Sequence, residues 1–168
     1  MDILMEEERF SIISEDDKQF IKEFDKQIGL LGYDCGRTIG SGYCWGRYMI
    51  IYSKSGAKTK KVIARIYIRE NNIVLRLFFN NINKHSDYIR QAPTHIKDVF
   101  INDRGLCGHC EGKKDKCNFR KTYVIDLDEI QKCSGVTFEF FNPTLSKLHD
   151  YIELIKEFYG KKLAVGNK

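Results

Sequence analysis

The sequence predicts a single α+β domain with a mainly antiparallel five-stranded sheet, packed by N-terminal, central and C-terminal helices. Apolar residues recur at helical spacing near both ends of the chain, and several segments between them show the period-two alternation typical of strands. A chain of 168 residues is an ordinary size for one domain and buries about two-thirds of its unfolded surface. We expect residues 1–160 to form this domain and residues 161–168 to be a flexible tail.

Three helices are predicted from their start signals and apolar stripes. Ser14 stands before three acidic residues, which is typical of a helix start, because the hydroxyl accepts a backbone hydrogen bond and the acids complement the helix dipole. The apolar stripe that follows runs to Leu31, and Gly32 fits a C-terminal cap. A central helix is expected over residues 94–100. The last helix is expected over residues 145–159, where the apolar stripe is clean.

Five strands are predicted from alternating residues. Their ranges are 47–53, 62–69, 73–79, 121–127 and 136–141. Only a short turn separates the second strand from the third, so these two are expected to form an antiparallel hairpin. One face of the hairpin is apolar and is expected to pack on the core, whereas the other face mixes arginines with aromatic residues.

Composition and charge exclude several classes of protein. The hydrophobic fraction of 42% rules out a disordered chain, and the apolar stretches are too short to predict a membrane span. The acidic N-terminus lacks the basic and apolar regions of a secretion signal, so we expect a cytoplasmic, reducing location. The net charge is +5 and the pI is near 8.8. A dedicated nucleic-acid-binding domain is expected to have a pI above about 9, so this chain is less basic than that class.

Four cysteines predict a structural zinc site. They are Cys107, Cys110, Cys117 and Cys133, with two, six and fifteen residues between successive members. Four thiolates satisfy tetrahedral zinc as a closed site, which would tie the loop after the central helix to the last two strands. Such a site lowers the formal charge from +5 to about +3. Three alternatives remain: His109 in place of Cys133, an iron–sulfur cluster, or a redox pair at Cys107 and Cys110.

A second candidate site combines a glycine-rich loop with the arginine-bearing face of the sheet. Its residues are Trp45, Arg47, Arg65, Tyr67 and Arg76. Pockets are mostly aromatic or apolar with a few convergent polar groups, so this set is predicted to bind a flat or anionic small molecule. The alternative is that Trp45 belongs to the core and the arginines form a solvated face. Cys35 and Cys44 are interpreted as small buried residues.

Several short motifs lie between Tyr88 and Tyr159. They are Tyr-Ile-Arg-Gln-Ala-Pro93, Cys-x2-Cys, Cys-Asn-Phe-Arg-Lys-Thr-Tyr123, Lys-Cys-Ser-Gly135 and Phe-Glu-Phe-Phe-Asn-Pro143. This stretch, under half of the chain, resembles a group of uncharacterised bacterial proteins, mostly from anaerobic Firmicutes, that are distantly similar to the YdhG-like small α+β domains. The resemblance implies a stand-alone intracellular domain of ligand-binding type with no established reaction. The cysteine cluster departs from the YdhG-like pattern.

Three functional classes follow from these features, beside a purely structural or interaction role. The first and favoured class is a zinc-stabilised small-molecule-binding or regulatory domain. The second is a zinc-containing nucleic-acid-binding protein, in which Tyr67 and Phe78 stack on bases while Arg65 and Arg76 hold phosphates. The third is an enzyme that uses a cysteine or zinc, although no paired carboxylates, nucleophile elbow or phosphate-binding glycine motif is present. The oligomeric state does not follow from the sequence.

Overall fold

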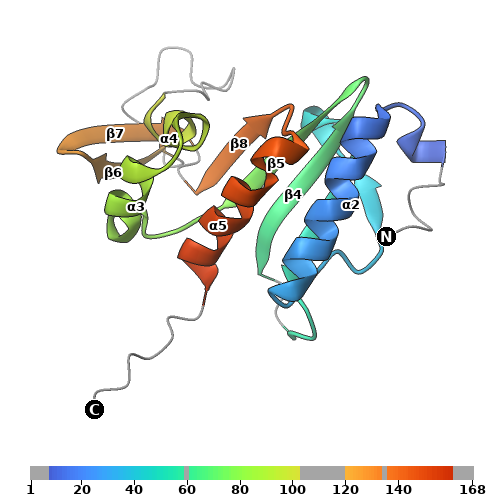
Figure 1. The fold of residues 1–168 in the computed structure, drawn as a ribbon, viewed down its shortest axis with the longest axis horizontal. Coiled ribbons are helices and arrows are strands. Elements are labelled where there is room, and N and C mark those ends of the chain that lie inside the picture. The colour runs from blue at the N-terminus through green and yellow to red at the C-terminus, as the bar shows by residue number, and fades with distance from the viewer. Residues whose placement is uncertain (1–7, 59–60, 103–119, 134–135, 161–168) are drawn as a thin grey trace.

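The computed structural model describes residues 8–58, 61–102, 120–133 and 136–160, which form an α+β fold. Its main sheet is antiparallel throughout and contains, among these residues, six strands (Figure 1). The strands are β1 (Tyr33–Asp34), β2 (Ile39–Ser41), β3 (Tyr48–Lys54), β4 (Val62–Arg69), β5 (Asn72–Phe78) and β8 (Thr137–Phe141). β1 and β2 both pair with β3, and the order continues through β4 and β5 to β8.

The predicted antiparallel sheet is confirmed, but its membership differs: β1 and β2 are added to it, and one predicted strand lies in another sheet. The predicted hairpin is present as β4 and β5, joined in a register that places Arg69 opposite Asn72. The segment predicted as a strand at 121–127 instead belongs to a separate two-stranded sheet, β6 (Arg120–Ile125) with β7 (Asp128–Cys133). Alternation indicates a strand but not its partner, and the short strands β1 and β2 have too few residues to show alternation at all.

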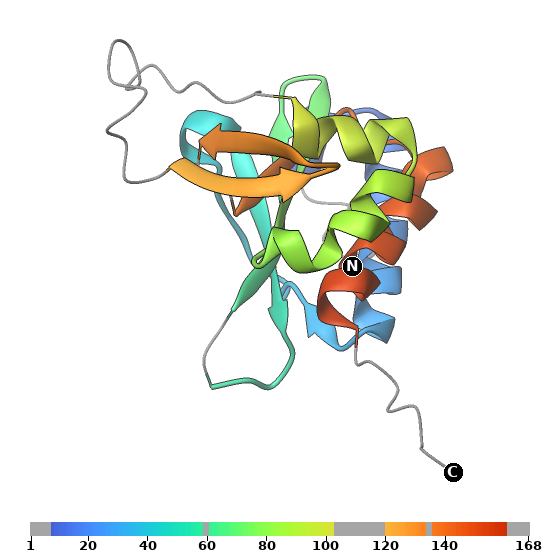
Figure 2. The ribbon, with the colours of Figure 1, turned by 90° about the vertical axis from the view of Figure 1, so that its left-hand side faces the viewer.

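Two helices cover one face of the main sheet. α2 (Glu15–Leu30) and α5 (Leu148–Tyr159) lie side by side on that face, as both views show (Figures 1 and 2). Phe24 of α2 packs edge-to-face on Tyr52 of β3, and Tyr151 of α5 packs against Phe140 of β8. Both helices were predicted, because their apolar stripes match the helical period. The apolar face of the sheet beneath them was also predicted, from the alternation of residues along the strands.

The predicted start and end of the first helix are confirmed in detail. The Ser14 side-chain oxygen accepts a hydrogen bond from the backbone N–H of Asp17 at 3.1 Å, which satisfies one of the free N–H groups of the first turn. Gly32 follows the helix with φ of +84°, a left-handed conformation that glycine adopts without a steric penalty. The turn then leads directly into β1.

A smaller unit lies beyond the β8 end of the sheet (Figure 1). It consists of α3 (Ser86–Gln91), α4 (Thr94–Ile101) and the β6–β7 hairpin. The hairpin holds the C-terminal end of α4, because the Tyr123 hydroxyl donates to the carbonyl of Phe100 and Lys132 Nζ donates to the carbonyl of Val99 at 2.6 Å. These carbonyls have no partner within the helix, and a lysine there complements the helix dipole.

Lys132 is an unusual residue in this unit, because its long cationic side chain is only 2% exposed. Its ammonium group lies 4.7 Å from the ring centroid of Phe138 on β8, in a cation–π arrangement. The hydrogen bond to Val99 and this ring contact offset part of the cost of burying a charge. The hairpin is thereby attached to both α4 and the main sheet.

Two predicted features fall partly or wholly outside the described residues. These are the tail at 161–168 and the segment that contains Cys107, Cys110 and Cys117. Among the helices that the structure describes, none has the length and apolar composition needed to cross a bilayer.

The turn between β6 and β7 generates the first testable prediction. Asp126 and Leu127 have φ of +54° and +71°, as a type I′ hairpin turn requires, and Leu127 is 97% exposed. A bulky residue in this conformation costs about 1 to 2 kcal/mol, whereas Asp-Gly is among the preferred pairs. Leu127→Gly should therefore stabilise the protein by about 1 kcal/mol, measured by urea unfolding.

The matched control is a substitution in the opposite direction at another turn. Gly56 has φ of +68° and no neighbouring atom within 4 Å of an added Cβ, so Gly56→Ala adds backbone strain without a clash and should destabilise the protein. If Leu127→Gly lowers stability instead, the side chain of Leu127 makes a contact that outweighs the strain.

Candidate functional site

Four of the five residues predicted to bind a ligand lie together on the sheet face opposite the helices. Arg65 and Tyr67 come from β4 and Arg76 comes from β5, while Trp45 reaches the same face from the short 3-10 turn Tyr43–Trp45. The Trp45 ring lies 5.9 Å from the Tyr67 ring, and the Arg76 guanidinium lies 4.0 Å from the Trp45 ring centroid. Tyr67 is buried and Trp45 is half-buried.

Two glycines allow the loop to carry Trp45 onto the sheet. The N–H of Gly42 donates to the carbonyl of Arg47, and the N–H of Arg47 donates to the carbonyl of Ile68 on β4 at 2.8 Å. A Cβ at Gly42 would overlap the carbonyl of Gly46, and one at Gly46 would lie 2.8 Å from the oxygen of Ile68. The glycine-rich loop is therefore needed for close approach of the backbone.

A buried ion pair fixes the arginine that stacks on Trp45. Arg76 Nε donates to Glu139 Oε1 of β8 at 2.7 Å, and the two side chains are only 13% and 11% exposed. The Tyr67 hydroxyl oxygen accepts from Arg76 at 3.4 Å and from Arg65 at 3.3 Å. The stacking and the hydrogen bonds together hold the Trp45 ring in one orientation.

The two arginines are direct cross-strand neighbours, since Arg65 pairs with Arg76 and Arg76 pairs with Glu139 across β4, β5 and β8. Like charges in that position repel each other. Among the described residues, Glu139 is the one carboxylate that compensates the charge of these two arginines. The Nε of Arg65 is buried without a hydrogen-bond partner, so this face carries an excess of positive charge.

The fifth predicted residue, Arg47, lies beside Glu70 instead of in this cluster. Its side chain is 57% exposed and lies 3.9 Å from Glu70. Arg47 and Trp45 line a hollow of about 450 Å³, together with Arg69, Glu70 and Asn72. In the described part of the chain Arg69 makes no ion pair, and the buried Oδ1 of Asn72 has no hydrogen-bond partner. The predicted site is thus split into a buried cluster and an open hollow that share Trp45.

The two cysteines outside the predicted zinc cluster differ from one another. Cys35 is half-buried, and its Sγ lies 3.7 Å from a carboxylate oxygen of Asp25. Burial raises the pKa of the Cys35 thiol, and the Asp25 carboxylate raises it further. Burial likewise raises the pKa of Asp25. Cys35 is therefore a poor nucleophile. Cys44 is exposed beside Trp45, so its interpretation as a buried residue is wrong.

Of the four predicted zinc ligands, the described residues include Cys133 alone. It is the last residue of β7, is half-buried, and pairs across the hairpin with Arg120. Cys107, Cys110 and Cys117 lie outside the described residues. Within the ranges that the structure describes, no group of three or more His, Cys, Asp or Glu side chains could hold a metal ion.

Sequence reasoning missed three residues of the candidate site, Glu139, Arg69 and Asn72. Glu139 alternates with Phe138 and Phe140 in the predicted last strand, which places it on the solvent side of the sheet but not beside Arg76. Only the pairing of β5 with β8 brings these two residues together. Arg69 and Asn72 flank the β4–β5 turn, and their role depends on Trp45 folding back toward that turn.

Replacement of Glu139 tests whether the buried cluster depends on its carboxylate. Glu139→Gln keeps the shape of the side chain but leaves two neighbouring arginines without a counter-charge, which should cost about 3 kcal/mol of unfolding free energy. Glu70→Gln is the matched control, because its ion pair with Arg47 is exposed and should contribute less than about 1 kcal/mol. Equal effects in urea unfolding would contradict the role given to Glu139. The emission of Trp45, the single tryptophan, should change more in Glu139→Gln than in Glu70→Gln.

Comparison with protein-family models, with curated proteins and with solved structures gave no match to this chain. The resemblance noted between Tyr88 and Tyr159 therefore stays a prediction. The function has to be inferred from the arrangement of the chain's own side chains.

Proposed function

We propose that the protein is a small-molecule-binding or regulatory domain that takes a small anionic ligand with a flat part in the hollow beside Trp45. The guanidinium of Arg69, which makes no ion pair with any residue that the structure describes, carries this proposal. It lines the hollow with Trp45, and among the described residues that line it two arginines face a single carboxylate, Glu70. The ligand's anionic group is placed on Arg69 and its flat part against the Trp45 ring.

The buried cluster supports this assignment by making Trp45 rigid. The Arg76 guanidinium covers one side of the indole at 4.0 Å, and Glu139 holds Arg76 in place. A ring that is already ordered loses little conformational entropy when a ligand binds.

The nucleic-acid class receives less support from the same face. Base stacking requires exposed aromatic rings, but Tyr67 is only 2% exposed. Phe78 is half-buried, with the Arg65 guanidinium 5.2 Å from its ring centroid. The two arginines that would hold phosphates in this class already have partners: Arg65 donates to Tyr67 and Arg76 donates to Glu139. A cysteine-based enzyme is also disfavoured at Cys35, whose thiol has a raised pKa.

Ligand binding can be tested with Trp45 as an intrinsic fluorescent reporter. We expect saturable changes in emission with benzoate or adenosine monophosphate, and much weaker changes with the neutral counterparts benzamide and adenosine. Arg69→Ala removes the cation that is proposed to hold the anionic group and should weaken binding of the charged probes about tenfold. Arg90→Ala, in α3, removes an exposed arginine outside the hollow and should leave binding unchanged.

Two results would overturn this proposal. One is the absence of any saturable response to all four probes, and the other is equal binding by the Arg69→Ala and Arg90→Ala variants. Circular dichroism of both variants confirms that the fold is retained. A gel shift at low salt that is lost at high salt would favour the nucleic-acid class instead.

We further propose that a structural zinc ion, held by Cys107, Cys110, Cys117 and Cys133, stabilises the domain in a reducing, cytoplasmic setting. The position of Cys133 fits this proposal. It pairs with Arg120, and Cys117 precedes Arg120 by three residues in the sequence. Two of the four ligands are therefore compatible with one metal site.

Zinc content and stability test this second proposal. Protein purified under reducing conditions should contain about one zinc per chain by elemental analysis, and EDTA should lower its melting temperature. Cys133→Ser should reduce the zinc content, whereas Cys44→Ser, at an exposed cysteine outside the cluster, should leave it unchanged. Metal-free protein, or two variants with the same zinc content, would refute the site. The ligand-binding test does not depend on this outcome.

A further inference from the structure

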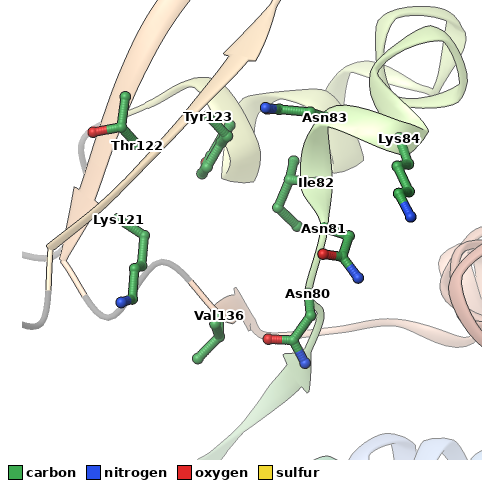
Figure 3. A pocket seen from close by; sticks show the side chains of 9 residues that line it. All are labelled: Asn80, Asn81, Ile82, Asn83, Lys84, Lys121, Thr122, Tyr123 and Val136. Carbon is green, nitrogen blue, oxygen red and sulfur yellow. The ribbon is translucent and has the colours of Figure 1, made fainter.

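A second hollow lies at the opposite end of β5 from the hollow beside Trp45. It has a volume of about 410 Å³ and opens between the segment that follows β5 and strand β6 (Figure 3). The first hollow includes Asn72 and the second includes Asn80, and eight residues of extended chain span about 26 Å. The two hollows are therefore separate sites.

The walls of this second hollow are polar and its floor is apolar. Figure 3 shows Lys121 and Thr122 on the β6 side, and Asn80 and Asn81 on the facing segment. The buried side chain of Ile82 and Val136 lie between the two walls. A volume of this size is within the range of small-molecule sites, which combine an apolar surface with a few convergent polar groups.

The charge of the lining selects the class of ligand. Lys121 and Lys84 both line the hollow, and no carboxylate does so among the described residues. In the same part of the chain, neither lysine side chain makes an ion pair or hydrogen bond, in contrast to Lys97 and Lys156, which pair with acids. An anionic group is therefore the complementary partner for Lys121.

The amide groups specify the rest of the ligand. A side-chain amide both donates and accepts hydrogen bonds, as does a hydroxyl group, so Asn80 and Asn81 match a ligand with several hydroxyl groups. The side-chain oxygen of Asn83 is already engaged, because this Oδ1 accepts a hydrogen bond from the backbone N–H of Val124 at 2.8 Å. This bond joins the segment after β5 to β6 and fixes the separation of the two walls.

We propose that this hollow binds a small hydroxylated anion of the sugar-phosphate or sugar-acid class. Lys121 contacts the phosphate or carboxylate, with Lys84 at the rim, while Asn80 and Asn81 contact the hydroxyl groups. The apolar floor formed by Ile82 and Val136 lies against the carbon skeleton. This site is independent of the hollow beside Trp45 and does not use the cysteine cluster.

The experiment uses the full chain with glucose 6-phosphate and gluconate as probes in isothermal titration calorimetry. We expect saturable binding of both probes, with much weaker binding of glucose and of inorganic phosphate, which each present half of the required chemistry. Lys121→Gln should weaken binding of glucose 6-phosphate about tenfold. Asn80→Ala should weaken binding of glucose 6-phosphate but leave the weak binding of inorganic phosphate unchanged.

Lys54→Gln is the matched control, because Lys54 is an exposed lysine at the end of β3 and does not line the hollow. This variant should bind glucose 6-phosphate as the unchanged protein does. Absence of binding by both anionic probes would overturn the proposal, as would equal affinity in Lys121→Gln and Lys54→Gln. Inorganic phosphate that binds as tightly as glucose 6-phosphate would also overturn it, because the amide wall would then have no role.

Discussion

The register between β4 and β5 is the constraint on which the candidate site depends. It places Arg65 directly opposite Arg76 on the sheet face that the two long helices leave uncovered. Two neighbouring cations inside a protein need an anion close by, and the pairing of β5 with β8 supplies one by placing Glu139 opposite Arg76. A shift of one residue in either pairing would turn these side chains toward the apolar core. Sheet register and charge balance are therefore coupled, and Trp45 is ordered as a consequence.

The sequence was most informative where a periodic pattern extended over many residues. Both long helices and the β4–β5 hairpin have apolar faces that follow a clear period, and Ser14 and Gly32 marked the limits of α2 by local chemistry alone. The sheet to which each strand belongs was harder to predict from the sequence. β7 contains Ile130 as its one large aliphatic residue among charged and polar neighbours, so a hydrophobic pattern cannot reveal it. With β7 hidden in this way, the alternation of β6 predicts a strand of the main sheet, whereas β6 pairs with β7 instead.

The candidate site was predictable in composition but not in geometry. The concentration of Trp45, Arg65, Tyr67 and Arg76 pointed to one face, and these four residues do meet. Arg47 separated from them because its backbone N–H is bonded to Ile68 and its side chain turns toward Glu70. The second hollow, between β6 and the segment that follows β5, could not be predicted from the sequence. Asn80 and Lys121 are 41 positions apart, and each alone is typical of an ordinary surface loop or strand.

The outer edge of β3 has a consequence for how the chain behaves among copies of itself. An uninterrupted edge strand can pair with a strand from another molecule and begin aggregation. Here β1 and β2 both lie along β3 but are short, and the chain between them turns through Gly36 and Arg37, both in left-handed conformations. The edge of the sheet is thus broken into two pieces, neither longer than three residues. A foreign strand finds too few consecutive free backbone groups there for stable pairing, so the β3 side of the sheet is protected against edge-to-edge association.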